Sequence, residues 1–117
     1  MINISEVHTK EDWEKIKSEA LNKNEIIVFK FSPICTVSFT AGKILDLWLS
    51  KLSLDNNLDV IKINVIESRE LSNIIATETD IKHESPQLIW FDDNRKIKWS
   101  YSHFRISEVQ LNMIIKN

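Results

Sequence analysis

The chain has 117 residues, 43% of them hydrophobic and 27% charged, and 15 basic against 17 acidic side chains give a formal net charge of −2 at pH 7. This composition is typical of a single globular domain, residues 1–117, that can bury a core without metals or crosslinks. The charges do not gather in blocks of one sign, which argues against nucleic acid or an anionic membrane surface as a partner.

The sequence also bears on the compartment. Met1 to Glu6 lacks the basic-then-apolar order of a signal peptide, and no apolar run approaches the roughly 20 residues needed to cross a bilayer. The only cysteine, Cys35, cannot form a disulfide within the chain, so no oxidising compartment is required. We therefore expect a cytoplasmic protein without a membrane segment, and expect it to be a monomer.

Helices and strands alternate in the first half of the chain. Thr9 followed by Asp12 resembles a capping box, with Asp in place of the usual Glu or Gln, and predicts the start of a helix. Residues 25–31 form an apolar, β-branched run that is typical of a buried central strand. From Cys35 to about Leu52, an apolar stripe at helical spacing predicts a second helix.

The second half of the chain continues the alternation. Residues 58–66 alternate as a strand does, and residues 68–79 carry a short helical pattern. Residues 87–91 and 96–101 are predicted to be two strands joined by a tight hairpin turn. Ser107 is expected to cap a last helix.

The predicted order of elements is α-β-α-β-α-β-β-α. Strands connected through a helix run parallel under the right-handed crossover rule, and the hairpin adds an antiparallel pair. This predicts an α/β fold with a four-stranded mixed sheet and helices on both faces. Sites in such sheets lie beyond the carboxyl ends of the parallel strands, where Cys35 follows residues 25–31.

Cys35 is the main candidate for chemistry. It lies at a predicted strand-to-helix junction, Ser38 follows three residues later, and Ser85-Pro86 precedes the strand at 87–91. A thiol at a helix start, faced by a proline loop, is the layout of a thiol–disulfide site. The thiolate is the attacking species, yet an ordinary thiol of pKa ~8.5 is only about 3% ionised at pH 7. The helix N-terminus and a hydrogen bond from Ser38, one turn on, would both favour the thiolate.

Serine at position 38 means that one sulfur must carry any redox chemistry. Cys35 can attack a mixed disulfide, keep the small thiol as an adduct and release the client protein. A second small thiol then clears the adduct by exchange. Reduction of a disulfide within a client is poorly supported, because this chain has no second cysteine to resolve the intermediate.

The chain resembles thioredoxin-fold proteins over nearly its whole length and, more narrowly, the monothiol bacilliredoxins of the bacillithiol system. The most specific match is the run His-Glu-Ser-Pro-Gln at 83–87. The others are residues 29–32, the Cys-x-x-Ser at Cys35 and Ser38, and residues 65–74 and 99–106. The chain departs from the usual Cys-Pro-Ile-Ser of that family in having Thr36 and Val37, which affects expectations of reactivity and not of fold.

The resemblance implies a small-molecule partner and a client site. It implies bacillithiol as co-substrate, bacillithiolated proteins as clients, and no bound cofactor. It also implies a cis bond before Pro86, which would turn the backbone of Ser85 toward Cys35 to pair with a client chain. His83 and Glu84, beside them, are further candidates for substrate contact.

Basic residues near the predicted site would suit an anionic adduct. Lys30 lies five residues before Cys35. His103 and Arg105 lie where the last strand gives way to the last helix, a junction expected at the same end of the sheet, and the free N–H groups near Ser107 add positive potential there.

Two alternatives remain open. The first is a thioredoxin-fold binding module in which Cys35 is structural or regulatory, and a normal thiol pKa would favour it. The second is a monothiol glutaredoxin that carries an iron–sulfur cluster. That family has a Cys-Gly-Phe-Ser motif and a Gly-Gly pair, whereas the single glycine here is Gly42. Three histidines and one cysteine show no metal-ligand spacing.

Overall fold

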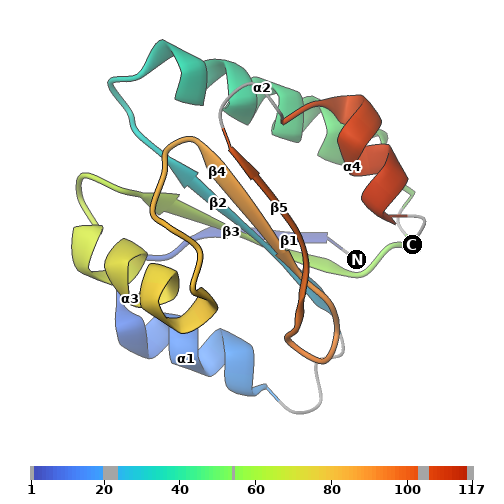
Figure 1. Cartoon of the computed structure of the whole chain (residues 1–117). Coiled ribbons are helices and arrows are strands. Elements are labelled where there is room, and N and C mark those ends of the chain that lie inside the picture. Colours follow the sequence, from blue (N-terminus) through green and yellow to red (C-terminus); the bar gives the residue numbers. More distant parts are fainter. Residues whose placement is uncertain (1, 20–23, 54, 103–105, 116–117) are drawn as a thin grey trace.

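Strands and helices alternate along the chain in the computed structural model, which describes residues 2–19, 24–53, 55–102 and 106–115 (Figure 1). The elements in chain order are β1 (Ile2–Glu6), α1 (Lys10–Ser18), β2 (Glu25–Phe31), α2 (Thr36–Lys51), β3 (Leu58–Asn64), α3 (Arg69–Thr79), β4 (Gln87–Phe91), β5 (Ile97–Ser102) and α4 (Glu108–Ile115).

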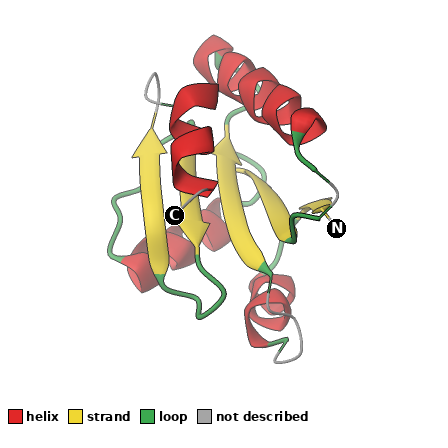
Figure 2. Cartoon of the chain, turned by 90° about the vertical axis from the view of Figure 1, so that its right-hand side faces the viewer, coloured by secondary structure: helices red, strands yellow, loops and turns green. Residues whose placement is uncertain are grey.

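The strands form one mixed sheet in the order β1-β3-β2-β4-β5. β1 and β2 both run parallel to β3, whereas β4 is antiparallel to β2 and to β5. Figures 1 and 2 show α2 and α4 on one face of the sheet and α1 and α3 on the other. The predicted parallel pair, the hairpin and the helices on both faces are thus confirmed. No helix in the described part of the chain is long and apolar enough to span a membrane.

The sheet has five strands, so the predicted number of four was wrong, and the predicted order α-β-α-β-α-β-β-α lacked the first strand. The strand that it lacked is β1, which pairs with β3 so that Ile4 lies opposite Val60. β1 is a five-residue edge strand with four exposed residues, and Ile4 itself is 52% exposed. Such a strand is held by backbone hydrogen bonds to one neighbouring strand. Because its side chains are mostly exposed, its sequence shows little hydrophobic pattern.

Local capping explains where the first and last helices begin. Thr9 has an extended backbone, and its hydroxyl accepts a hydrogen bond from the Asp12 N–H at 3.1 Å, as the capping-box pattern predicts. Ser107 accepts from the Gln110 N–H at 3.3 Å in the same way at the start of α4. Each cap satisfies an N–H group that has no partner within its helix.

The core has two layers, one on each face of the sheet. One layer lies between the sheet and helices α2 and α4, and it contains Ile27, Phe29 and the buried residues of α2. The other lies between the sheet and helices α1 and α3, and it contains Ile26, Val28 and Leu71. Successive residues of β2 therefore point to opposite layers, as the period of two in a strand requires. Three fully buried tryptophans each donate an indole N–H: Trp13 to Glu78 (3.1 Å), Trp48 to Asn112 (2.9 Å) and Trp90 to Glu25 (2.8 Å).

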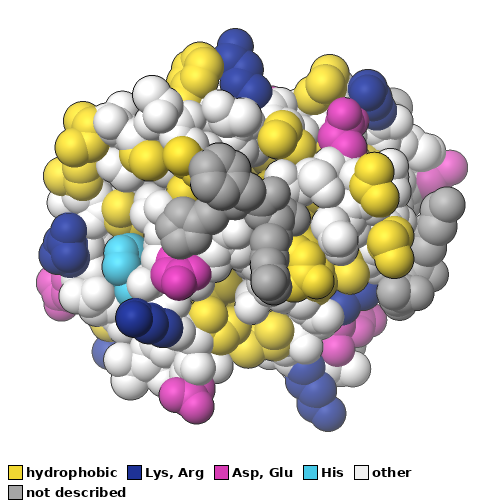
Figure 3. All heavy atoms as spheres, turned by 45° about the horizontal axis from the view of Figure 1, so that its top comes forward, with side chains coloured by type: hydrophobic (Ala, Val, Ile, Leu, Met, Phe, Trp, Pro, Cys, Tyr) yellow, Lys and Arg dark blue, Asp and Glu magenta, His cyan; other side chains and the backbone are white. Residues whose placement is uncertain are grey.

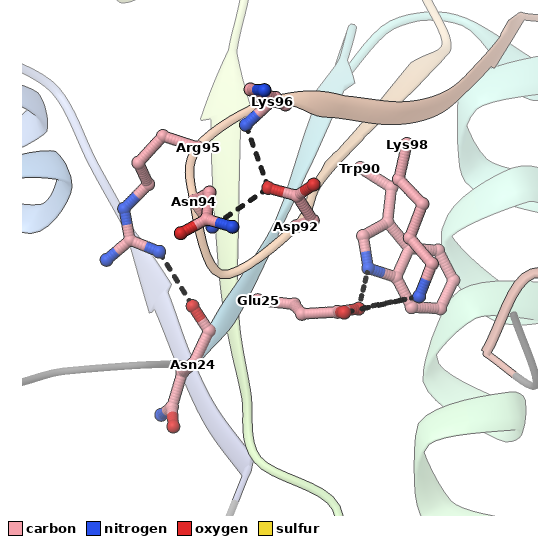
Figure 4. Close-up of polar contacts among 8 residues, drawn as sticks. All are labelled: Asn24, Glu25, Trp90, Asp92, Asn94, Arg95, Lys96 and Lys98. Carbon is pink, nitrogen blue, oxygen red and sulfur yellow. Dashed lines mark hydrogen bonds and ion pairs between the residues drawn. The ribbon is translucent and has the colours of Figure 1, made fainter.

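Polar contacts fix the β4–β5 hairpin to the start of β2 (Figure 4). The Asp92 carboxylate accepts two backbone N–H groups of the turn, at 2.8 and 3.0 Å. Arg95, at φ 65°, donates to the Asn24 carbonyl at 2.7 Å, and Glu25 accepts from Lys98 at 3.0 Å. This network lies at the N-terminal end of β2. The opposite end of β2 leads into the loop that carries Cys35.

Candidate active site

Cys35 is a free, half-buried thiol at the N-cap of α2. Its N–H donates to the Ser32 carbonyl at 3.3 Å, and its own carbonyl accepts the Phe39 N–H at 3.1 Å, which begins the helical ladder. Ser32 and Pro33 end β2 because proline has no N–H for a strand ladder. The sequence prediction of a thiol at a helix start is confirmed.

The start of α2 lowers the pKa of the Cys35 thiol. The N–H of Ser38 has the largest effect and the N–H of Val37 the next, burial opposes them, and the Ser38 hydroxyl adds a further lowering. Within the described residues, no ionisable side chain contributes to this shift. Hydrogen bonds to the thiolate therefore activate the sulfur without a neighbouring base.

The Ser38 hydroxyl lies at a junction of two loops and α2. Ser38 is 2% exposed, and its Oγ accepts the Ser32 N–H at 3.0 Å. The same oxygen lies 3.3 Å from the Ser85 Oγ. The serine that replaces a second cysteine is thus held by both segments that flank Cys35 in space.

The loop between α3 and β4 supplies the second side of the site. The Ser85–Pro86 peptide bond is cis, and Pro86 is buried. Figure 1 shows this loop at the same end of the sheet as the loop from β2 to α2. The structure therefore brings Ser85 to Ser38, three residues after Cys35, although 47 residues separate the two serines in sequence.

Lys30 is buried below this end of the sheet and away from solvent. Its side chain is 0% exposed, and its Nζ donates to the Ser72 carbonyl on α3 at 2.9 Å. Burial lowers the pKa of Lys30 to about 8. This placement does not support the predicted contact between Lys30 and a bound anion, because the amine faces α3.

His83 joins the same buried polar cluster. Its Nδ1 lies 2.9 Å from the Ser72 Oγ. Burial lowers the pKa of His83, the positive charges of Lys30 and Arg69 lower it further, and the charge of Glu84 opposes them. Together these effects favour the neutral form of the ring. His83 is half-buried, two residues before Ser85, and its expected contact with substrate stays a prediction.

The remaining predicted residues are placed only in part. Glu84 is half-buried, next to Ser85 in the α3–β4 loop. His103 and Arg105 lie outside the described residues. Among the described residues, no group of three or more His, Cys, Asp or Glu side chains is arranged to hold a metal ion.

A groove of about 580 Å³ runs along α2 beside Ser38, and the sequence analysis did not predict it. Phe39 belongs to the apolar stripe that predicted α2, yet it is 68% exposed and lines this groove. Figure 3 shows several separate groups of exposed hydrophobic side chains on the face that it presents. The groove is lined by Phe29, Phe31, Ser32, Pro33, Ser38, Phe39, Gly42, Lys43, Asp46, Leu47 and Lys62.

The charged rim of the groove differs along its length. Lys62 forms an ion pair with Asp46 at 2.8 Å, whereas the Lys43 amine lies 5.1 Å from the centre of the Phe39 ring. The groove thus has an apolar floor, with the Lys62–Asp46 ion pair and the Lys43 amine at its edge. The one feature that could have indicated it is the width of the apolar pattern on α2, which exceeds what one buried face can hold.

Comparisons with known proteins agree with this architecture. A family model described as "Monothiol bacilliredoxin BrxC" matches residues 5–111. A solved structure described as a candidate oxidoreductase with a thioredoxin fold is 26% identical, with a TM-score of 0.81 over 96% of this chain and 93% of that one. The chain is also similar to thioredoxins of Schistosoma mansoni (17% identity, TM-score 0.72, 97% and 94% of the two chains) and Fasciola hepatica (18%, 0.70, 95% of each). The predicted thioredoxin-like fold is therefore confirmed.

Proposed function

Because this chain belongs to the monothiol bacilliredoxin family, whose match and thioredoxin fold support thiol–disulfide oxidoreductase activity, we propose that it removes bacillithiol from mixed disulfides on client proteins. The observation that carries the proposal is a half-buried Cys35 at the N-cap of α2, with a lowered pKa and with serine one turn on. A lowered pKa favours a reactive thiol over a redox-silent one.

The proposed reaction has two exchange steps. The Cys35 thiolate attacks the bacillithiol sulfur of the client's mixed disulfide. A bond forms between the two sulfurs, and the bond to the client sulfur breaks, so the client leaves as a thiolate and takes up a proton. A second bacillithiol thiolate then attacks the bacillithiol sulfur of the adduct, which frees the Cys35 thiolate and releases bacillithiol disulfide. The disulfide bond thus passes from the client to a pair of bacillithiol molecules: the client sulfur is reduced, and the sulfur of the second bacillithiol is oxidised.

The residues around the sulfur have distinct parts in these steps. The Val37 and Ser38 N–H groups and the Ser38 hydroxyl stabilise the thiolate, both as the attacking group and as the group released in the second step. Ser38 cannot form a disulfide, so the adduct persists until a second small thiol arrives. The backbone of Ser85, beside the cis bond to Pro86, is the proposed contact for an extended client segment.

Transfer from a bacillithiolated model protein, followed by intact mass spectrometry of both proteins, tests the proposal. We expect the enzyme to gain the mass of one bacillithiol and the client to lose it. A parallel reaction with a glutathionylated client separates the two small thiols. If the wild-type chain takes up neither thiol, the proposed function is wrong.

Replacing Ser38 by alanine should raise the pKa of Cys35, because the thiolate loses a hydrogen-bond donor. One hydrogen bond is worth about 1 kcal/mol, so we expect the thiolate population at pH 7 to fall about two- to tenfold. The rate of iodoacetamide alkylation as a function of pH measures the shift. Ser50→Ala, which removes an exposed hydroxyl on the same helix, should leave the profile unchanged. An unshifted Ser38→Ala profile would show that the hydroxyl does not act on the sulfur.

A second candidate function is a binding module that holds clients without exchange. The observation in its favour is the apolar groove beside Ser38, with Phe39 and Leu47 exposed. Such a module would bind a client peptide equally well with Cys35→Ser and would show no adduct in the mass measurement.

A further inference from the structure

The Ser38 hydroxyl has three possible hydrogen-bond partners but only one proton to donate. A serine hydroxyl carries one proton to donate and two lone pairs that accept. The Ser32 N–H occupies one lone pair of Ser38 at 3.0 Å. The Ser85 hydroxyl, at 3.3 Å, and the Cys35 sulfur remain as partners for one lone pair and one proton.

Only two arrangements satisfy this hydroxyl. In the first, Ser85 donates to Ser38, and Ser38 donates to the sulfur of Cys35. In the second, Ser38 donates to Ser85, and the sulfur receives nothing from it. A thiolate is a charged acceptor and binds a proton donor more strongly than a neutral hydroxyl does, so ionisation of Cys35 selects the first arrangement. A neutral sulfur, as in the thiol or the adduct, exerts no such preference.

We propose that Ser85 is a positioning residue, whose hydroxyl donates to Ser38 and thereby directs the Ser38 proton at the Cys35 thiolate. This inference rests on the proposed function in one respect, namely that Cys35 acts as the attacking sulfur. Ser85 does not touch the reacting atoms in this arrangement. It acts through Ser38, which is 2% exposed and is held in place from the other side by Ser32.

The hydrogen bonds of the Ser38 hydroxyl connect the two loops that form the site. Ser32 belongs to the β2–α2 loop and Ser85 to the α3–β4 loop, and both meet at one oxygen on the first turn of α2. Hydrogen bonds in a chain polarise one another, so a hydroxyl that accepts from Ser85 is a stronger donor to the sulfur. A client that displaces the α3–β4 loop would therefore change the reactivity of Cys35.

The test compares alkylation profiles of single and double variants. The chain has one cysteine, so the rate of iodoacetamide alkylation as a function of pH reports Cys35 alone. Ser85→Thr keeps the hydroxyl, whereas Ser85→Val introduces a side chain of the same shape as threonine that has no hydroxyl. We expect Ser85→Thr to follow the wild type, and Ser85→Val to react about two- to fivefold more slowly at pH 7 with its profile displaced to higher pH. His83 and Glu84, the titratable groups on the same loop, are common to all the proteins compared.

The double variant separates positioning from a direct effect. In a Ser38→Ala background, changing Ser85 to threonine or to valine should give identical profiles, because the residue through which Ser85 acts is absent. Two results would overturn the inference: overlapping Ser85→Thr and Ser85→Val profiles when Ser38 is present, or an equal displacement between them when Ser38 is absent. Failure of bacillithiol transfer by the wild type would instead contradict the proposed function, since alkylation needs no bacillithiol.

Discussion

Replacing Cys35 by serine should abolish bacillithiol transfer, with no adduct on the variant and no loss of bacillithiol from the client. A serine hydroxyl is not ionised near neutral pH, so it does not attack the mixed disulfide. It also cannot form the disulfide bond that holds bacillithiol in the adduct. Intact mass spectrometry of the client and the variant, sampled over the same times as for the wild type, measures the loss. Cys35 is half-buried and differs from serine by one atom, so the variant should retain the fold.

A second variant tests whether the single sulfur explains the stable adduct. Ser38→Cys places a thiol where the Ser38 hydroxyl now lies, one turn along α2 from Cys35. The introduced thiolate should attack Cys35 in the adduct, form an internal disulfide and expel bacillithiol. The adduct seen with the wild type should then be replaced by a protein two hydrogens lighter. Transfer by Cys35→Ser at the wild-type rate would contradict the proposal altogether.

Replacing Lys30 by methionine should stabilise the protein at pH 7. Lys30 is 0% exposed, and burial lowers its pKa from 10.5 to about 8, which corresponds to about 3 kcal/mol of preference for the neutral form. The hydrogen bond to the Ser72 carbonyl offsets part of this cost, so we expect a net gain of about 1–3 kcal/mol from a side chain of similar length. Urea unfolding at pH 7 measures the gain. Lys96→Met, which changes an exposed lysine, is the matched control.

The same substitution should also remove a pH dependence. Between pH 8 and 10.5, the unfolded chain keeps the proton of Lys30 while the folded protein has released it, so the wild type gains stability as the pH rises through this range. Below pH 8 both states carry the proton, and Lys30 adds no slope. Measuring both proteins in a Cys35→Ser background removes the overlapping titration of the thiol. If Lys30→Met unfolds at lower urea than its parent at pH 7, or keeps the slope, then burial of the amine is not a cost.

Much of this fold is readable from short stretches of sequence. The apolar runs at 25–31 and 87–91 predict strands that the structure contains, because a strand buried on both faces needs apolar residues on both. Cys35 could be placed at a helix start because Pro33 ends the preceding strand and a helical stripe follows. The expected contact of Lys30 with an anion overlooked its register in β2: Lys30 shares a face with Ile26 and Val28, whose side chains pack beneath α1 and α3.

Other features needed the assembled structure. β1 is held by backbone pairing with β3, a contact between segments more than 50 residues apart that its own side chains do not encode. Phe39 has the spacing of a core residue, and only the position of α2 on the sheet shows that it lines a groove. The spacing of apolar residues in the sequence therefore does not show how much of a helix is covered by the rest of the fold.

By itself the sequence determined the order of elements from α1 onward, the single sulfur and the serine one turn beyond it, because these follow from residue type and local spacing. Only the tertiary structure decided what surrounds that sulfur. The contact between Ser38 and Ser85 forms because β2 and β4 are neighbours in the sheet, which brings the loops at their ends together. Hydrogen bonds between such distant residues depend on chain geometry to within a few tenths of an ångström, and no local pattern carries that information.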